Sequence, residues 1–305
     1  MSFVEESIFV PALPAGKQGN NVDQLHLKRF YSDPAGIPLF LIHGSIENGK
    51  IFYTSSGKGL APYLAKEGFD VFVVDLRGRG KSTPKVDKHA THGLTNTMEE
   101  DIPAAVEKIK EIKGDVPQHW ISHSWGGVSL LGYLAKESTN VNLKSMVFFS
   151  TKRHISIRSL RKFYLIDILW NMMGRFAVWR NGYLPASKIK IGADDESARC
   201  YKETSDWVSQ SRWLDWRDQF DYAAALQYID LPPILSVTGA GDKVLGHPTD
   251  CMYLLNEIKA SNYEFKILGR KQGYLQDYDH INILTHPDAL KEQYLMARDW
   301  ILQHN

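Results

Sequence analysis

The chain has 305 residues, of which 43% are hydrophobic and 23% charged, so it can bury a full core. Its formal net charge of +1 gives no overall electrostatic reason to expect a nucleic-acid partner. The two cysteines, Cys200 and Cys251, lie far apart and have neither the density of a disulfide framework nor metal-ligand spacing. We therefore predict free thiols and expect no metal and no cofactor.

The amino terminus carries Glu5 and Glu6 where a secretory signal needs basic residues followed by an apolar run. Together with the free thiols, this predicts a cytoplasmic location. The most apolar tract, 163–173, contains Asp167 and is shorter than the roughly 20 residues of a membrane-spanning helix. It is interpreted as part of an amphipathic helix, and no stable membrane insertion is expected.

Short β-rich runs alternate with segments of helical periodicity along most of the chain. The expected strands are 8–13, 25–31, 37–42, 71–76, 119–123, 144–150, 234–238 and 263–268. The expected helices are 50–66, 98–113, 126–136, 248–259 and 287–303. This alternation predicts an α/β fold with an eight-stranded, mostly parallel sheet covered by helices on both faces. The first two strands have no helix between them and predict an antiparallel hairpin at the sheet edge.

The alternation breaks between the sixth and seventh strands. This stretch shows no convincing strand but holds five of the eight tryptophans, namely Trp170, Trp179, Trp207, Trp213 and Trp216. A structureless loop of such length is implausible in a compact domain. We predict a helical cap insertion at 152–229, between core segments 1–151 and 230–305.

Ser124 lies at an abrupt change from strand to helix, in the run Ser122-His123-Ser124-Trp125-Gly126-Gly127. A serine on such a turn has an exposed hydroxyl, and small residues on either side let strand and helix approach closely. A plain alternative is that Ser122 or Ser124 only caps the following helix. The run resembles the G-x-S-x-G turn of the α/β-hydrolase superfamily, with Ser122 in place of the first glycine.

The resemblance implies a catalytic triad in the chain order Ser, then Asp or Glu, then His. Asp242 follows the strand at 234–238, and His280 follows the last strand, so they are expected to be the orienting acid and the general base. Asp242 alone is equally well explained as a turn residue. Among the other histidines, His123 is expected to project away from Ser124, while those at 247 and 286 precede prolines at helix starts.

Acyl transfer also needs two donors for the oxyanion. One is expected to be the backbone N–H of Trp125. The segment PLFLIHGSIENG resembles the superfamily's H-G-x oxyanion loop, which assigns the second donor to the N–H of Ser45, with Ile46 as the neighbouring possibility. His43 is expected to be structural. The run 75–82 resembles the D-x-R-G-x-G-x-S turn of the same superfamily, in which Asp75 and Arg77 can brace the backbone.

Family members that open epoxides or displace halide resemble one another in an Asp nucleophile and an H-G-x-P loop, and polyester synthases of the fold use Cys. This chain has none of these features at the matching positions. The resemblance implies a serine hydrolase that cleaves small carboxylic esters with an apolar acyl or alcohol part through an acyl-enzyme. The alternatives are an acyltransferase or perhydrolase with the same triad, and a non-catalytic ligand-binding member.

The insertion is expected to lie above the carboxyl ends of the strands, where open α/β sheets bind ligands. Its tryptophans either line an apolar pocket or fill the insertion's own core. A basic run covers 152–162, with Lys152, Arg153, His154, Arg158, Arg161 and Lys162. Such a run can attract an anionic substrate or a lipid surface, but a solvated helix face is the favoured interpretation.

Overall fold

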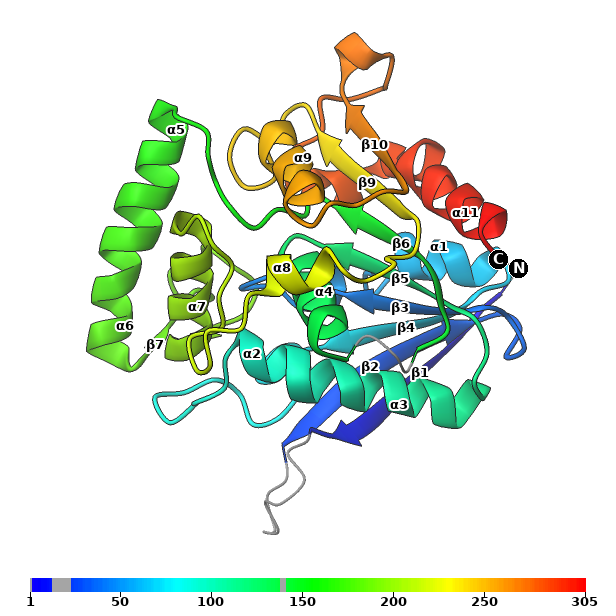
Figure 1. Ribbon diagram of the computed structural model, residues 1–305. Helices are drawn as coiled ribbons and strands as arrows, with labels where there is room; N and C mark the ends of the chain where they lie inside the picture. Colours follow the sequence, from blue (N-terminus) through cyan, green and yellow to red (C-terminus); the bar gives the residue numbers. More distant parts are fainter. Residues whose placement is uncertain (1, 13–22, 138–140) are drawn as a thin grey trace.

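The computed structural model describes residues 2–12, 23–137 and 141–305, and its centre is one eight-stranded sheet (Figure 1). The strands follow the spatial order β1-β2-β4-β3-β5-β6-β9-β10. Their bounds are β1 Val4–Pro11, β2 Gln24–Tyr31, β3 Pro38–Ile42, β4 Asp70–Asp75, β5 Gln118–His123, β6 Leu143–Phe149, β9 Ile234–Gly239 and β10 Tyr263–Leu268. All eight predicted strands are therefore present, although Leu13, the end predicted for the first, lies outside the described residues.

The first two strands form the predicted antiparallel hairpin at the sheet edge. Strand β1 pairs with β2, and β2 pairs antiparallel with β4, whereas every other pairing in the sheet is parallel. Every residue of β3, β4 and β5 is buried, because helices cover both faces of the sheet centre. The carboxyl ends of the parallel strands consequently lie along one edge, where the loops that carry the predicted site residues meet.

Each face of the sheet has its own hydrophobic core. On one face, Phe40 and Phe148 pack with helices α3 (Ile102–Lys113), α4 (Trp125–Glu137) and α9 (Pro248–Glu257). On the other, Leu41 and Val147 pack with α1 (Leu60–Lys66) and α11 (Gln293–Gln303). Neighbouring residues of one strand thus enter different cores, as the period of two in a strand requires.

Two of the predicted helices are wrong in extent. The helix expected over 50–66 is a short turn of 3-10 helix at Gly49–Ile51, followed by α1. Gly57 and Gly59 both have positive φ, so the backbone between these two pieces cannot be helical. The helix expected over 287–303 is divided into a 3-10 segment, Pro287–Lys291, and α11, because Glu292 between them has φ of −128° and ψ of −91°.

The segment between β6 and β9 is mainly helical. Elements α5 (Leu160–Lys162), η3 (Phe163–Gly174, a π-helix) and α6 (Arg175–Asn181) follow one another without a break and form one long helix. It lies beside α7 (Ala198–Ser209), and α8 (Tyr222–Leu226) then returns the chain to the sheet (Figure 1). The segment also contains two strands, β7 (Tyr183–Leu184) and β8 (Glu196–Ser197), which the sequence did not indicate because two residues show no alternation.

Aromatic side chains join this segment to the main core. Trp207 packs against Trp213 and Tyr222, and its ring centroid lies 6.5 Å from that of Trp125 on α4. Trp207 and Trp213 thus belong to the main core, whereas the interpretation of the tryptophans as core residues expected a core internal to the insertion. Within the described residues, no helix is both long enough and apolar enough to cross a membrane. Cys200 and Cys251 are free, as predicted, and both are buried.

Candidate active site

Ser124 occupies a strained turn between β5 and α4. Its φ of 52° lies in the left-handed region, which a non-glycine residue rarely adopts. The Ser124 N–H donates to the carbonyl of Phe149 at 2.9 Å, which fixes the turn against β6. A Cβ on Gly126 would lie 2.5 Å from the Ile42 carbonyl oxygen, so the helix can approach β3 only because this residue is glycine. Backbone strain of this kind persists where the surroundings enforce it, often at functional sites.

Ser124, His280 and Asp242 form one hydrogen-bonded chain. The Oγ of Ser124 lies 3.0 Å from Nε2 of His280, and Nδ1 of His280 lies 2.6 Å from Oδ2 of Asp242. Burial raises the pKa of Asp242, but the charge and hydrogen bond of His280 outweigh this, and the net pKa is lowered. Asp242 is then an acceptor only, so Nδ1 carries the proton and Nε2 can accept from the serine hydroxyl. This is the polarity that a general base beside a nucleophile requires.

His123, next to Ser124, is buried and bonds to a different set of partners. Its Nδ1 lies 2.8 Å from Oε2 of Glu47, and its Nε2 lies 2.8 Å from the backbone carbonyl oxygen of His280. Both partners accept hydrogen bonds, so both ring nitrogens must donate and His123 is an imidazolium. Consistently, its pKa is raised, because Glu47 outweighs the burial that lowers it.

Glu47 is the residue that the sequence analysis missed. Burial raises its pKa, but the charge and hydrogen bond of His123 prevail and hold the pKa at about 2. Its Oε2 also accepts from the N–H of Gly44 at 2.9 Å. Glu47 thus connects the loop after β3 to the loop that carries His280. The sequence does show an acid three residues after the His43-Gly44 pair, but its position does not indicate that His123 is its partner.

Glu47, His123 and His280 also bring potential metal-ligand atoms within 4.8 Å of one another. The described contacts use these atoms otherwise. The two nitrogens of His280 are bonded to Ser124 and Asp242, and both nitrogens of His123 donate hydrogen bonds. A doubly protonated imidazole has no free lone pair for a metal. Glu47, His123 and His280 therefore form a network of hydrogen bonds and charges whose nitrogen atoms are not available as metal ligands.

His43 fixes the loop after β3 through two hydrogen bonds of its ring. The N–H of Leu76 donates to Nε2 of His43 at 3.1 Å, so Nδ1 carries the proton and donates to the Gly44 carbonyl at 2.8 Å. Burial, followed by the charge of Arg79, lowers the pKa of His43, in agreement with a neutral ring. This is the structural role predicted for it.

Glu196 on β8 also binds the loop after β3. Its Oε2 accepts from the Ser45 hydroxyl at 2.7 Å and from the Ile46 N–H at 3.1 Å, while Oε1 pairs with the guanidinium of Arg79. Glu196 and Arg79 are both buried. Because the Ile46 N–H is occupied by Glu196, it is not free for a substrate. Ser45 remains the predicted donor of this loop, and Trp125 begins α4 directly after Ser124.

Asp75 braces the turn at 75–82, as predicted. Its Oδ2 accepts from the Lys81 N–H and its Oδ1 from the Gly49 N–H, both at 2.8 Å. Arg77 instead bonds to Asp101 in the helical segment before α3, with Nη2 to Oδ1 at 2.8 Å. The turn is thereby fixed to the loop after β3 on one side and to the helix layer on the other.

The two histidines that precede prolines and the basic run at 152–162 are not part of the hydrogen-bonded chain that begins at Ser124. His247 and His286 cap helical segments by accepting from the N–H groups of Thr249 and Asp288. Their structural role is as predicted. The interpretation of 152–162 as a solvated face is wrong for its first two cations, because Lys152 and Arg153 are buried, the latter bonded to the Trp207 carbonyl. The two arginines at 158 and 161 are exposed.

A cleft of about 860 Å³ lies between α7 and the loop at 210–219. Arg199, Trp207 and Trp216 are among its lining residues, whereas Ser124, Asp242 and His280 are not. The cleft therefore does not mark the site where Ser124 would meet a substrate.

Residues 37–189 match the family model described as alpha/beta hydrolase fold. Among curated proteins, Lipase lipl-3 of Caenorhabditis elegans is 24% identical over 106 residues, which are 33% of this chain and 26% of that protein. The match thus spans about a quarter of the length of the relative.

Solved structures resemble nearly the whole chain. A thermophilic esterase from Thermogutta terrifontis has a TM-score of 0.61 at 15% identity, covering 98% of this chain and 100% of that one. The alpha/beta hydrolase GrgF from Penicillium sp. sh18 has a TM-score of 0.64 at 15% identity, covering 99% of each chain. At such identity the likeness concerns the fold. With the family match over half of the sequence, it shows that the chain belongs to the alpha/beta hydrolase fold family.

Proposed function

We propose that this protein is a serine hydrolase that cleaves carboxylic esters through an acyl-enzyme. The observation that carries the proposal is the hydrogen-bonded chain from Ser124 through His280 to Asp242, with each step at 3.0 Å or less. Membership in the hydrolase family supports the reaction class, and esterase and lipase are the activities in the names of two similar proteins.

In the proposed reaction, Nε2 of His280 takes the hydroxyl proton as Ser124 Oγ attacks the ester carbonyl carbon. The N–H groups of Trp125 and Ser45 donate to the oxyanion of the tetrahedral intermediate. Its collapse breaks the bond to the alcohol oxygen, which receives the proton from His280. Water then attacks the acyl-enzyme with His280 again as base, and the acid is released. Asp242 keeps the ring in the required tautomer and stabilises the imidazolium.

We also propose that the segment at 152–229 acts as a cap over this site, in a reaction without metal or cofactor. Support for the cap comes from the bonds of Glu196 to Ser45 and Ile46, since they bring the insertion directly onto the loop beside the nucleophile. The substrates we expect are small esters with an apolar acyl or alcohol part, and the compartment we expect is the cytoplasm.

The test is turnover of p-nitrophenyl esters of increasing acyl length by the wild type and by Ser124→Ala. Loss of a triad nucleophile is expected to lower kcat by about 10³–10⁶-fold. A fluorophosphonate probe should modify the wild type at Ser124 alone. The matched control is Ser122→Ala, which removes a neighbouring hydroxyl two residues earlier and should keep both turnover and labelling. Equal turnover by Ser124→Ala and the wild type would reject the proposal.

A further inference from the structure

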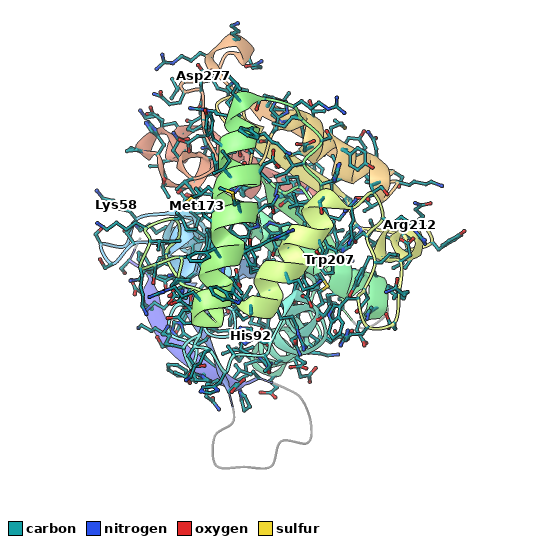
Figure 2. The ribbon with its side chains drawn as sticks, turned by 90° about the vertical axis from the view of Figure 1, so that its left-hand side faces the viewer. Lys58, His92, Met173, Trp207, Arg212 and Asp277 are labelled. Carbon is teal, nitrogen blue, oxygen red and sulfur yellow. The ribbon has the colours of Figure 1, made fainter. Side chains whose placement is uncertain are left out.

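The long helix of residues 160–181 exposes large apolar side chains along its solvent side. In Figure 2 this helix stands in front of the rest of the molecule, with Met173 on it. Leu160 near one end and Trp179 near the other are 79% and 80% exposed. We define the outer face by six exposed residues: Leu160, Tyr164, Met172, Met173, Phe176 and Trp179. Several large apolar side chains exposed on one helix often mark a surface that binds a partner or a membrane.

The opposite side of the helix is firmly packed, so the exposure does not come from a detached segment. Ile166 is buried, and Trp170 donates from Nε1 to the Ser205 hydroxyl of α7 at 2.9 Å. A Cβ on Gly174 would lie 2.8 Å from the hydroxyl of Tyr201, which shows how closely the two helices approach. The helix therefore presents its outer face in a fixed orientation.

Exposed cations lie close to the outer face along the chain. The sequence from 158 to 190 contains seven Arg or Lys residues and one acid, Asp167, in a chain whose net charge is only +1. Asp167 pairs with Lys162 at 2.7 Å. The six other cations are all exposed, namely Arg158, Arg161, Arg175, Arg180, Lys188 and Lys190. An exposed apolar stripe flanked by Arg and Lys is the pattern of a helix that lies in the plane of a lipid interface.

We propose that the outer face docks on an anionic lipid surface, with its apolar side chains among the acyl chains and its cations at the headgroups. Charge complementarity selects this occupant. A second copy of the chain, joined through the same face, would bring six cations of one molecule against six of the other. An uncharged surface would offer these cations no opposite charge.

Docking in this way would bring the lipid close to the candidate active site. Ala177 and Val178, on the inner side of the same helix, pack in one cluster with Ile46, the neighbour of Ser45. The proposal does not depend on turnover, because it concerns binding at the outer side of the insertion. Ser124→Ala should therefore dock as the wild type does, which separates this inference from the proposed hydrolysis.

The first test is co-sedimentation with phosphatidylcholine vesicles that do or do not contain phosphatidylglycerol. We expect binding to the anionic vesicles, at least about tenfold weaker binding to pure phosphatidylcholine, and release at high salt, which shortens the Debye length to about 3 Å at 1 M. Phe176→Ser with Trp179→Ser should lower binding at least about tenfold, because both rings leave the lipid. Tyr228→Ser, a residue 92% exposed outside the outer face, is the matched control.

The charge test uses Arg175→Glu with Arg180→Glu. This pair should abolish sedimentation with anionic vesicles, whereas Lys144→Glu with Lys259→Glu should not. Lys144 is exposed at the amino-terminal end of β6, and the exposed Lys259 precedes β10, so both controls lie at the sheet edge opposite the insertion. Circular dichroism establishes that the variants are folded. Equal binding to both vesicle types, no binding, or a dimer that Trp179→Ser dissociates would each overturn the proposal.

Discussion

Glu196 on β8 accepts a hydrogen bond from the hydroxyl of Ser45, a residue 151 positions earlier in the chain. The same carboxylate pairs with the buried guanidinium of Arg79, so Glu196 joins the segment between β6 and β9 both to the loop after β3 and to the turn at 75–82. Removing one partner of a buried ion pair leaves the other charge without compensation. The contact is therefore expected to control both the stability of this edge of the sheet and the geometry of the loop.

Glu196→Ala should destabilise the protein by about 3–5 kcal/mol, since Arg79 stays buried and loses its carboxylate. Urea unfolding followed by circular dichroism measures this. The double variant with Arg79→Met should recover part of the loss, because no unpaired charge remains. Ester turnover should fall in Glu196→Ala even well below the unfolding midpoint, through displacement of Ser45. Unchanged stability would contradict the role given to this pair.

The pair of Glu47 and His123 predicts a pH window of stability. The pKa of Glu47 is lowered to about 2, so its contribution is complete above the ordinary value of 4.5 and is lost as the pH falls toward 2. The pKa of His123 is raised, so its contribution is complete below 6.5 and is lost as the pH rises through the folded-state value. The ion pair should therefore stabilise most between about pH 4.5 and 6.5.

Glu47→Gln tests this window, because it keeps the shape of the side chain and removes its charge. The difference in unfolding free energy from the wild type should be on the order of 3 kcal/mol at pH 5.5 and should shrink toward pH 2 and at alkaline pH. Nitrogen NMR of His123 should show two protonated ring nitrogens in the wild type. A difference that stays constant from pH 2 to 9 would show that the pair is not ionic.

Asp242→Asn should leave the fold intact and lower kcat by about 10⁴-fold, since an amide no longer holds His280 with Nε2 free to accept a proton. KM should change little. Residues that act as one unit are not additive, so Asp242→Asn combined with Ser124→Ala should be no slower than Ser124→Ala alone. A loss of less than tenfold, or full additivity in the double variant, would contradict the orienting role of Asp242.

Features that depend on neighbouring residues could be predicted from the sequence, whereas contacts between residues far apart in the chain could not. The strands followed from local alternation, and the meeting of Ser124, Asp242 and His280 in one hydrogen-bonded chain was expected from their places after strands. Glu47 escaped because its partner His123 lies 76 positions away, and nothing local distinguishes a buried acid from a solvated one. Glu196 escaped for the same reason. The helix expected over 50–66 failed because its apolar spacing persists across Gly57 and Gly59, whose positive φ values break the helix.

Gly126 and Gly127, which follow Trp125 in the turn after Ser124, face different obstacles: backbone atoms crowd the first and side-chain atoms crowd the second. A Cβ on Gly126 would lie 2.5 Å from the Ile42 carbonyl oxygen and 2.8 Å from that of His43, and neither can move without shifting β3. A Cβ on Gly127 would instead lie 2.5 Å from Cγ2 and 2.6 Å from Oγ1 of Thr151. Both alanine variants should lose stability, by about 1–3 kcal/mol for ordinary overpacking and more for Gly126→Ala.

A second substitution, at Thr151, distinguishes the effect of Gly127→Ala from that of Gly126→Ala. Thr151→Ala removes the two nearest atoms that crowd Gly127→Ala and leaves the Ser122 Oγ, at 2.8 Å from the added Cβ, so the double variant should regain part of the lost stability and ester turnover. The same Thr151→Ala should give no rescue to Gly126→Ala, whose obstacle is backbone. Thermal unfolding of the two single and two double variants, with Thr151→Ala alone as control, measures the coupling directly. Equal rescue of both glycine variants would mean that helix α4 can shift as a body, and that the turn at Ser124 is not held by its contact with β3.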